Sequence, residues 1–300
     1  MASDFLSHNI TIIGGDYRQF LLYEDFVQRG FSVSGIALQN NTFPDTQKEA
    51  EVHAESICSI TTLLPSDVWI TGIPFTKDHV HIYSENPNCM ITLEYFFRFL
   101  TQHPPKMLIG GHFTKELIDF SREYQIPCHD LLKCDAIAIE NAIPTAEGAI
   151  YHAIEASSSV LHKNKCLVLG FGKCGKVLAA KLKGMDANVT VCARREEDLA
   201  AAEAMGYEAK TYKNVIPSLG SYMFIFNTVP VRILDKNKLS YVNKDAVIID
   251  IASMPGGVDF ETAKNLGIKT KHCLGIPGKL SPKTAADILS KQIITLLKSL

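Results

Sequence analysis

The chain has 300 residues, of which 46% are hydrophobic and 21% charged, and its formal net charge is -2. This composition is typical of globular proteins and excludes the disordered and fibrous classes. The balanced charge excludes a strongly basic surface for nucleic acid or anionic lipid. No run reaches the ~18 apolar residues of a membrane helix, and residues 1–9 lack a signal-peptide pattern. We therefore expect a cytoplasmic protein that acts on small molecules, without nucleic-acid or membrane partners.

The 8 cysteines form no CxxC pair and show no paired spacing typical of zinc sites. We expect reduced, mostly buried thiols and no bound metal. Cys174 is the thiol to watch, because a helix N-terminus lowers the pKa of a cysteine.

The first predicted elements are a strand at residues 9–13, a turn at Gly14-Gly15-Asp16 and a helix that ends at Gly30. This order is typical of the start of an open α/β sheet. The polar segment 40–51 is assigned to no element. We predict one α/β domain over residues 1–140, with further strands at 31–38, 68–70 and 107–109.

A helix is predicted to start at Pro144 or Thr145 and to run to Leu161, because proline favours the first helical turn and apolar residues follow at helical spacing. This helix links the two domains. Glu147 lies three residues into it, where capping and catalysis explain a carboxylate equally well. A terminal helix is predicted at residues 282–300, packed onto the first domain.

Strand and helix patterns alternate regularly in the second half, which predicts a parallel sheet over a domain of residues 141–281. The expected strands are 166–170, 188–193, 222–227 and 246–251, and the expected helices are 173–185 and 196–205.

The first of these strands runs into the motif GxGxxG, formed by Gly170, Gly172 and Gly175. Gly170 permits a tight turn, Gly172 allows the backbone to approach a pyrophosphate, and Gly175 lets the helix pack close to the strand. A helix N-terminus also attracts phosphate. Together with its flanking elements the motif predicts dinucleotide binding, with Lys173 and Cys174 in the same turn. A tight turn without a ligand is the alternative.

About 20 residues after such glycines, NAD-binding domains place an acidic residue on the ribose. Here Arg194 and Arg195 follow the second strand instead. A guanidinium pairs with the 2′-phosphate of NADP, so we predict NADP as the cofactor. Alternatively, both arginines simply begin a solvated helix whose first turn is acidic.

Two loops follow later strands of this sheet. Because ligands of open α/β sheets bind at the carboxyl ends of strands, these loops are expected to border the ribose and nicotinamide. Ordinary turn chemistry explains their composition equally well. The cofactor-binding candidates in them are Asn227, Thr228, Val229, Pro230 and Ala252.

Several longer blocks accompany the glycine motif. They are IGGDYRQ at 13–19, CDAIA at 134–138, NAIPTAEG at 141–148, DIASMPGGVD at 250–259 and GIPGKLSPKTA at 275–285. With GFGKCG at 170–175, they resemble the family of the dipicolinate synthase A subunit. The resemblance runs nearly from end to end.

This resemblance implies two Rossmann-like domains and NADP-dependent oxidation of dihydrodipicolinate to dipicolinate in the mother cell of a spore-forming bacterium. It also implies a partner, the flavoprotein-like B subunit of the same synthase. Assembly into a homo-oligomer is compatible with the sequence.

Oxidation of a dihydropyridine needs hydride departure and loss of a ring proton, so the protein mainly has to position a flat dicarboxylate. Carboxylates favour cations, hydroxyls and helix N-termini. The substrate-binding candidates are Thr145, Ser253, Gly256, Gly257, Lys279 and Thr284, and helix capping, turn chemistry or solvation explains each of them as well. His112 is the first candidate proton acceptor, because its pKa suits the task; Glu147 is the second.

Two alternatives remain open. One is a two-domain 2-hydroxy-acid or amino-acid dehydrogenase, although His272 alone does not make the usual Arg, Glu and His set. The other is a non-catalytic subunit that only binds NADP. Reduction of NADP by the isolated chain, when it is given dihydrodipicolinate, would exclude the non-catalytic alternative.

Overall fold

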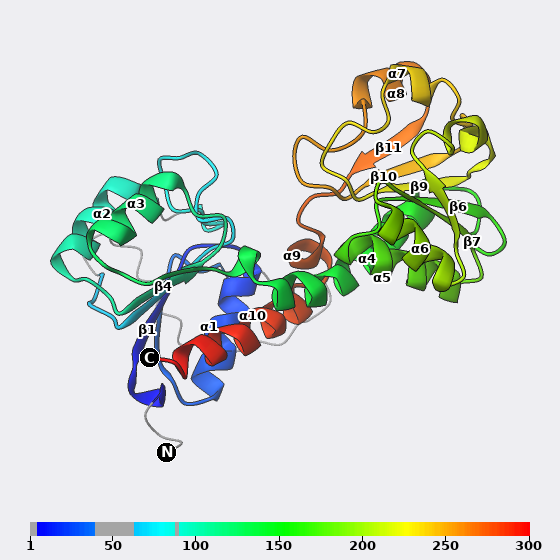
Figure 1. Ribbon diagram of the computed structural model, residues 1–300. Coiled ribbons are helices and arrows are strands. Elements are labelled where there is room, and N and C mark those ends of the chain that lie inside the picture. Colours follow the sequence, from blue (N-terminus) through cyan, green and yellow to red (C-terminus); the bar gives the residue numbers. More distant parts are fainter. Residues whose placement is uncertain (1–4, 40–62, 88–89) are drawn as a thin grey trace. The chain divides into compact units, whose positions relative to one another are not determined.

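The computed structural model describes residues 5–39, 63–87 and 90–300 (Figure 1). It divides into unit 1, formed by Met1–Ala138 with Ser281–Leu300, and unit 2, formed by Ile139–Leu280. Segment 40–51, for which no element was predicted, lies outside the described residues, as do Cys58 and Cys89.

Unit 1 contains one parallel sheet of five strands in the order β2-β1-β3-β4-β5. Its strands are β1 (Asn9–Ile13), β2 (Ser32–Ile36), β3 (Val68–Thr71), β4 (Met107–Gly110) and β5 (Cys128–Asp130). Because β2 and β3 flank β1 on opposite sides, the chain reverses its direction across the sheet between β1 and β3. In open α/β sheets such a switch point is where ligands bind.

Helices cover both faces of this sheet (Figure 1). They are α1 (Tyr17–Gln28), α2 (Leu93–Gln102), α3 (Lys115–Glu123) and α10 (Pro282–Leu297), with short 3-10 helices η1 (Phe5–Ser7) and η3 (Leu131–Lys133). Alternate strand residues point to opposite faces, so Ile12 packs in one core cluster with α1 and α10, while Trp69 packs in another with α2 and α3.

Unit 2 contains a parallel sheet of six strands in the order β11-β10-β9-β6-β7-β8. Its strands are β6 (Lys165–Leu169), β7 (Asn188–Ala193), β8 (Glu208–Thr211), β9 (Phe224–Asn227), β10 (Val247–Asp250) and β11 (Lys269–His272). Counted from β6, this is the 3-2-1-4-5-6 order of dinucleotide-binding domains. The prediction of α/β architecture with parallel sheets is confirmed.

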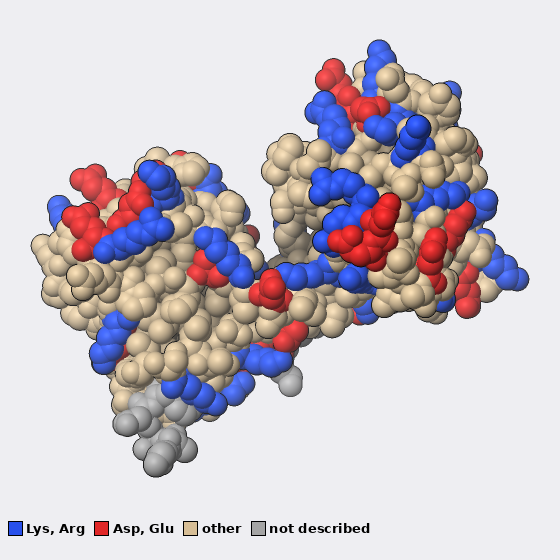
Figure 2. All heavy atoms as spheres, viewed as in Figure 1, with Lys and Arg blue, Asp and Glu red and all other residues tan. Residues whose placement is uncertain are grey.

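The helices of unit 2 pack on its sheet and include α4, which begins in unit 1. They are α4 (Asp135–Ala156), α5 (Lys173–Gly184), α6 (Glu196–Ala204), α7 (Lys236–Leu239), α8 (Phe260–Asn265) and α9 (Ile276–Leu280), with the 3-10 helix η4 (Ile216–Ser221). No helix among the described residues is long and apolar enough to cross a membrane. On the face shown in Figure 2, acidic and basic side chains are interleaved.

The predicted start of the linker helix is wrong. Helix α4 begins at Asp135, so Pro144 lies inside it and Thr145 is not at an N-terminus. An interior proline costs about 3 kcal/mol in helix stability because it removes one backbone hydrogen bond. Packing opposes that cost, since small residues on one face of the helix are fully buried against the core of unit 2: Ala146, Ala149 and Ala153.

Candidate functional site

The turn after β6 holds three glycines that meet different surroundings. Gly170 has a φ of +98°, and a side chain there would collide with Thr228. A side chain on Gly175 would collide with the carbonyl oxygen of Gly170, so α5 packs against the turn as the motif predicts. At Gly172 a Cβ would meet no atom within 4 Å. No protein contact requires glycine at position 172, and the open space is available to a ligand.

Helix α5 begins at this open position. Gly172 is its N-cap and provides no side-chain hydrogen bond, and the first turn, with Lys173, contains no acidic residue. Uncapped amides and the positive end of the helix dipole together favour an anion. Cys174 in the same turn is not activated, because burial raises the pKa of its thiol; the expectation of a lowered pKa is wrong.

The glycine turn after β6 is hydrogen-bonded to the loop after β9. Strand β9 is the neighbour of β6 on the other side of the switch point. Both the amide and the hydroxyl of Thr228 donate to the carbonyl oxygen of Leu169, each at 2.9 Å. Val229 is partly exposed and Pro230 exposed beside it. These residues lie where Rossmann domains hold a dinucleotide.

A buried pair of polar side chains fixes the loops after β9 and β10. The Asn227 amide donates to Oδ1 of Asp250 at 2.8 Å, and both residues are fully buried. Asp250 also accepts the amides of Ala252 at 3.0 Å and Gly257 at 2.7 Å. This role of Asp250 was not predicted from the sequence. The signal was a polar residue at the end of each of two adjacent buried strands.

These hydrogen bonds correct part of the substrate prediction. The Gly257 amide is used by Asp250, and the Gly256 amide donates to the Ser253 carbonyl oxygen at 2.9 Å, so neither amide is free for a carboxylate. Ser253 itself is exposed. The Ala252 carbonyl oxygen interacts with Nε2 of His272 at 2.8 Å, which occupies that imidazole.

The two arginines after β7 differ. Arg195 is the N-cap of α6, and its guanidinium donates to Asp198 at 2.8 and 2.9 Å. It therefore behaves as the solvated helix start that was the alternative explanation. Arg194 is exposed, and no hydrogen bond or ion pair engages it among the described residues. Only Arg194 is free to meet an incoming phosphate.

The remaining substrate-binding candidates of unit 2, and the candidate catalytic residue Glu147, lie in helices. The Thr145 hydroxyl donates to the Asn141 carbonyl oxygen at 2.6 Å within α4. Glu147 accepts from Lys181 of α5 at 2.7 Å, with 59% of its side chain exposed. Lys279 lies in the short helix α9, where it is exposed.

Two candidates belong to unit 1. Thr284 is exposed in the first turn of α10, whose N-cap is Ser281. His112 follows β4 with a φ of +57°, and its amide donates to Oδ1 of Asp130 at 3.2 Å. The His112 imidazole is exposed, and no partner holds it among the described residues.

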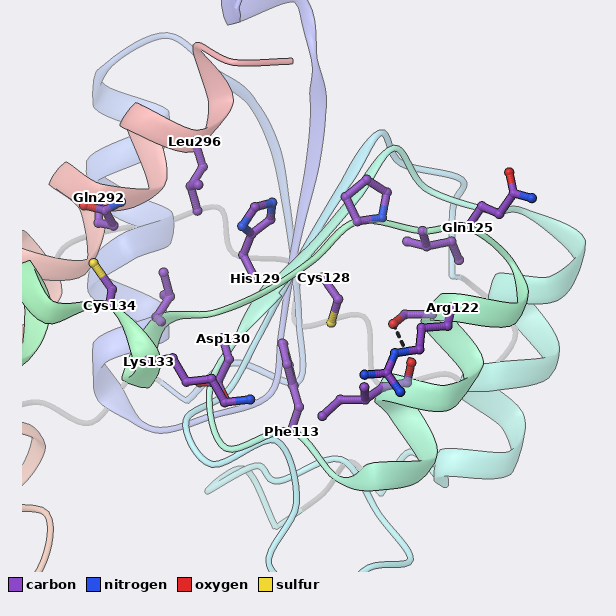
Figure 3. Close-up of a pocket in the computed structure, with 15 residues that line it drawn as sticks. Phe113, Arg122, Gln125, Cys128, His129, Asp130, Lys133, Cys134, Gln292 and Leu296 are labelled. Carbon is purple, nitrogen blue, oxygen red and sulfur yellow. Dashed lines mark hydrogen bonds between the residues drawn. The ribbon is translucent and has the colours of Figure 1, made fainter.

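Unit 1 also contains an open cavity of about 700 Å³ beside the edge strand β5 (Figure 3). Cys128, His129 and Arg122 line it, together with residues of α10. Burial raises the pKa of the Cys128 thiol to about 11, so the thiol is inert at neutral pH. None of the predicted site residues lines this cavity.

Comparison with known families separates the chain into two matched regions. The model of the N-terminal domain of the dipicolinate synthase A subunit matches residues 9–132. The NAD-binding domain of D-isomer specific 2-hydroxyacid dehydrogenases matches residues 144–255. The second match confirms a dinucleotide-binding domain around the GxGxxG turn.

Individual relatives point the same way. The dipicolinate synthase A subunit of Bacillus subtilis (strain 168) is 37% identical over 167 residues, which span 56% of each chain. The solved structure of the A subunit from Bacillus halodurans is 28% identical, with a TM-score of 0.82 over 97% of this chain and 98% of that one. D-lactate dehydrogenase from Escherichia coli, at 13% identity and a TM-score of 0.62 over 97% of each chain, shares the fold alone.

Proposed function

Because the chain belongs to the family of the dipicolinate synthase A subunit, we propose that it oxidises dihydrodipicolinate to dipicolinate with NADP. The observation that carries this proposal is the open N-terminus of α5 at Gly172, together with Arg194 after β7, which no hydrogen bond or ion pair engages among the described residues. When bound, the nucleotide accepts a hydride from the substrate.

Each part of this turn has a task in holding the nucleotide. The first amides of α5 bind the diphosphate, and Gly172 leaves room for it. Arg194 pairs with the 2′-phosphate, a charge-assisted contact that NAD does not offer. Thr228, Val229 and Pro230 border the nicotinamide ribose at the switch point.

The substrate needs positioning more than acid-base chemistry, because aromatisation of its ring drives the reaction. Exposed hydroxyls and cations at Ser253, Lys279 and Thr284 are candidates for its carboxylates. His112, exposed after β4, is the proton acceptor that the sequence predicts.

The 2-hydroxy-acid dehydrogenase alternative has less support. His272 contacts the Ala252 carbonyl oxygen at 2.8 Å and stacks on Phe260, with ring centroids 5.2 Å apart. One ring nitrogen of His272 is therefore engaged by a backbone carbonyl, and its ring face is packed on Phe260. A histidine with these contacts serves packing rather than proton transfer.

The names of the relatives describe one lettered component of a synthase with several components. We infer from those names that this chain also works with a second component, flavoprotein-like by resemblance, in the cytoplasm.

Calorimetric titration with NADP and NAD tests the cofactor assignment. We expect NADP to bind at least tenfold more tightly, about 1.4 kcal/mol. Arg194→Gln should remove this preference, because NAD lacks the phosphate that the guanidinium binds. The control Arg195→Gln should retain it, since Asp198 already occupies Arg195. Equal affinities in the unmodified chain would refute the role of Arg194.

Turnover is tested with dihydrodipicolinate generated enzymatically in the assay. The isolated chain is expected to reduce NADP, which absorbance of NADPH reports. Tight NADP binding without any reduction would instead favour the non-catalytic alternative.

A further inference from the structure

Segment 72–87, which follows β3, lies across the carboxyl ends of the other strands of unit 1. Three hydrogen bonds attach it to the turns after β1, β4 and β2. They are Gly15 N to Tyr83 O at 2.6 Å, Phe75 N to Gly111 O at 2.9 Å and Ser84 Oγ to Ala37 O at 2.7 Å. The segment therefore covers the switch point between β1 and β3, the place where open α/β sheets bind ligands.

This segment contains a cavity of about 440 Å³. Among the residues that line it are Lys77, Asp78, His81, Tyr83 and Glu85. A planar ring with two carboxylates is small enough for such a volume, given that ligand pockets start near about 300 Å³. Neither the sequence motifs nor the nucleotide site accounts for these side chains.

Asp78 and His81 form an ordered pair in this cavity. Oδ2 of Asp78 lies 2.7 Å from Nδ1 of His81, and 26% of the histidine side chain is exposed. The hydrogen bond from the His81 side chain and those from the backbone amides of Val80 and His81 hold the pKa of Asp78 well below its usual range. An ionised carboxylate at Nδ1 fixes the proton on that nitrogen and leaves the lone pair on Nε2.

Lys77 supplies a cation beside this pair. Its ammonium lies 3.6 Å from the centroid of the Tyr83 ring, and no carboxylate pairs with it in the part of the chain that the structure describes. Glu85 is occupied, because it accepts the Tyr83 hydroxyl at 2.9 Å. Burial raises the pKa of Tyr83, so that hydroxyl stays protonated. The ring orients the ammonium without neutralising it.

We propose that this cavity binds the planar dicarboxylate substrate, with Lys77 pairing to one carboxylate and Nε2 of His81 accepting the ring proton lost on oxidation. This inference rests on the proposed function and deepens it. The electron pair of the C–H bond that loses the proton becomes a ring π bond. The other C–H bond gives its hydrogen with both electrons to the oxidised nicotinamide nucleotide. Asp78 stays ionised and stabilises the imidazolium of His81, which later returns the proton to water.

His81 is better prepared for this task than His112. The imidazole of His81 has a carboxylate that fixes its tautomer, whereas no partner orients His112 among the described residues. Proton acceptors in enzymes are usually oriented by such a third group.

Two measurements on the full chain test the proposal: binding of dipicolinate, measured by calorimetry, and reduction of NADP with dihydrodipicolinate as the substrate. The other titratable groups that line this cavity are Lys77, Asp78, Tyr83 and Glu85. Because the Lys77 ammonium pairs with one carboxylate, binding of dipicolinate should depend on this side chain.

Two variants and one control complete the experiment. His81→Asn should retain dipicolinate binding but lower the rate of NADP reduction with dihydrodipicolinate by about 100-fold or more, as loss of a general base predicts. Lys77→Gln should weaken dipicolinate binding about tenfold, as loss of one charge-assisted contact predicts. Lys106→Gln, at an exposed lysine before β4 and outside this cavity, should behave like the wild type. If His81→Asn does not fold, Lys77→Gln still decides, since Lys77 is exposed.

Unchanged dipicolinate affinity in Lys77→Gln, or an unchanged rate of NADP reduction in His81→Asn, would overturn the inference. NADP titrations of the same variants separate this failure from failure of the proposed function. A chain that binds and reduces NADP would lose only this inference if Lys77→Gln bound dipicolinate normally or His81→Asn kept its rate of NADP reduction. A chain that never reduces NADP would lose the proposed function.

Discussion

Both units begin with a strand, a glycine turn and a helix, yet their helix N-termini differ. In unit 1, Asp16 caps α1 by accepting the Arg18 amide at 3.1 Å, and its own amide donates to the Gln19 side chain at 3.0 Å. In unit 2, α5 starts at Gly172 without any side-chain cap. The same topology thus gives one closed and one open anion site. The residue at the N-cap decides which of the two a glycine-rich turn forms.

In the capped turn of unit 1, the nearby cation Arg18 is already engaged by protein groups. The Arg18 guanidinium donates to Asp16 at 2.8 and 2.7 Å and to the Ile73 carbonyl oxygen at 2.8 Å. Only 13% of the Arg18 side chain and 16% of the Asp16 side chain are exposed. In unit 2, by contrast, Arg194 remains unpaired among the described residues, so the open site keeps both its amides and its cation for a ligand.

Asp16→Ala is expected to give the largest effect, a loss of stability in unit 1. It removes the cap and leaves a mostly buried guanidinium without its carboxylate, which should cost about 3 kcal/mol of stability. Trp69, buried in unit 1, is the single tryptophan of the chain, so its fluorescence during urea unfolding reports on this unit. NADP affinity should not change, because unit 2 holds the nucleotide.

Asp287→Ala is the matched control in the same unit. Its ion pair with Lys283 is exposed, at 3.2 Å on α10, and should contribute less than about 1 kcal/mol. If both variants unfold at the same urea concentration, the turn of unit 1 is not stabilised by its cap.

Gly172→Val tests the open turn. A side chain at this position meets no protein atom, so the fold should persist while the diphosphate is displaced. We expect NADP and NAD affinity to fall together by about 100-fold, or about 2.7 kcal/mol, because both nucleotides share the diphosphate.

Gly184→Val, at the other end of α5, provides the control. Its Cβ also meets nothing within 4 Å, but it is remote from the turn in sequence. Calorimetry should show wild-type affinity for this variant. Wild-type affinity for Gly172→Val as well would refute a diphosphate at the N-terminus of α5.

The sequence was most informative where local patterns decide the structure. The predicted strands 9–13 and 188–193 match β1 and β7 residue for residue, because buried apolar runs end at turns there. The edge strands β5, β8 and β11 were not predicted, because their partly or fully exposed residues, such as Lys210 and Lys271, carry no hydrophobic pattern.

Within the site, the glycine roles followed from the motif, whereas hydrogen-bond partners did not. The engagement of Gly257 depends on Asp250, which reaches it across a loop. The difference between Arg194 and Arg195 depends on which side chain Asp198 meets. Such choices are made by tertiary geometry, and residue types at a given spacing do not encode them.

Glu147→Gln is expected to have the smallest effect on stability. It tests whether a carboxylate that already has a partner, like Arg195 and unlike Arg194, is kept from acting on a ligand. Glu147 already accepts from Lys181 and is largely exposed, so the pair should contribute at most about 0.5 kcal/mol to stability. The amide of glutamine keeps a hydrogen bond to Lys181 while it removes all proton-accepting ability. If Glu147 only joins α4 to α5, NADP reduction should keep its rate and its pH profile. A rate loss of more than about tenfold without loss of stability would instead place Glu147 in the chemistry, since general bases contribute about 100-fold or more.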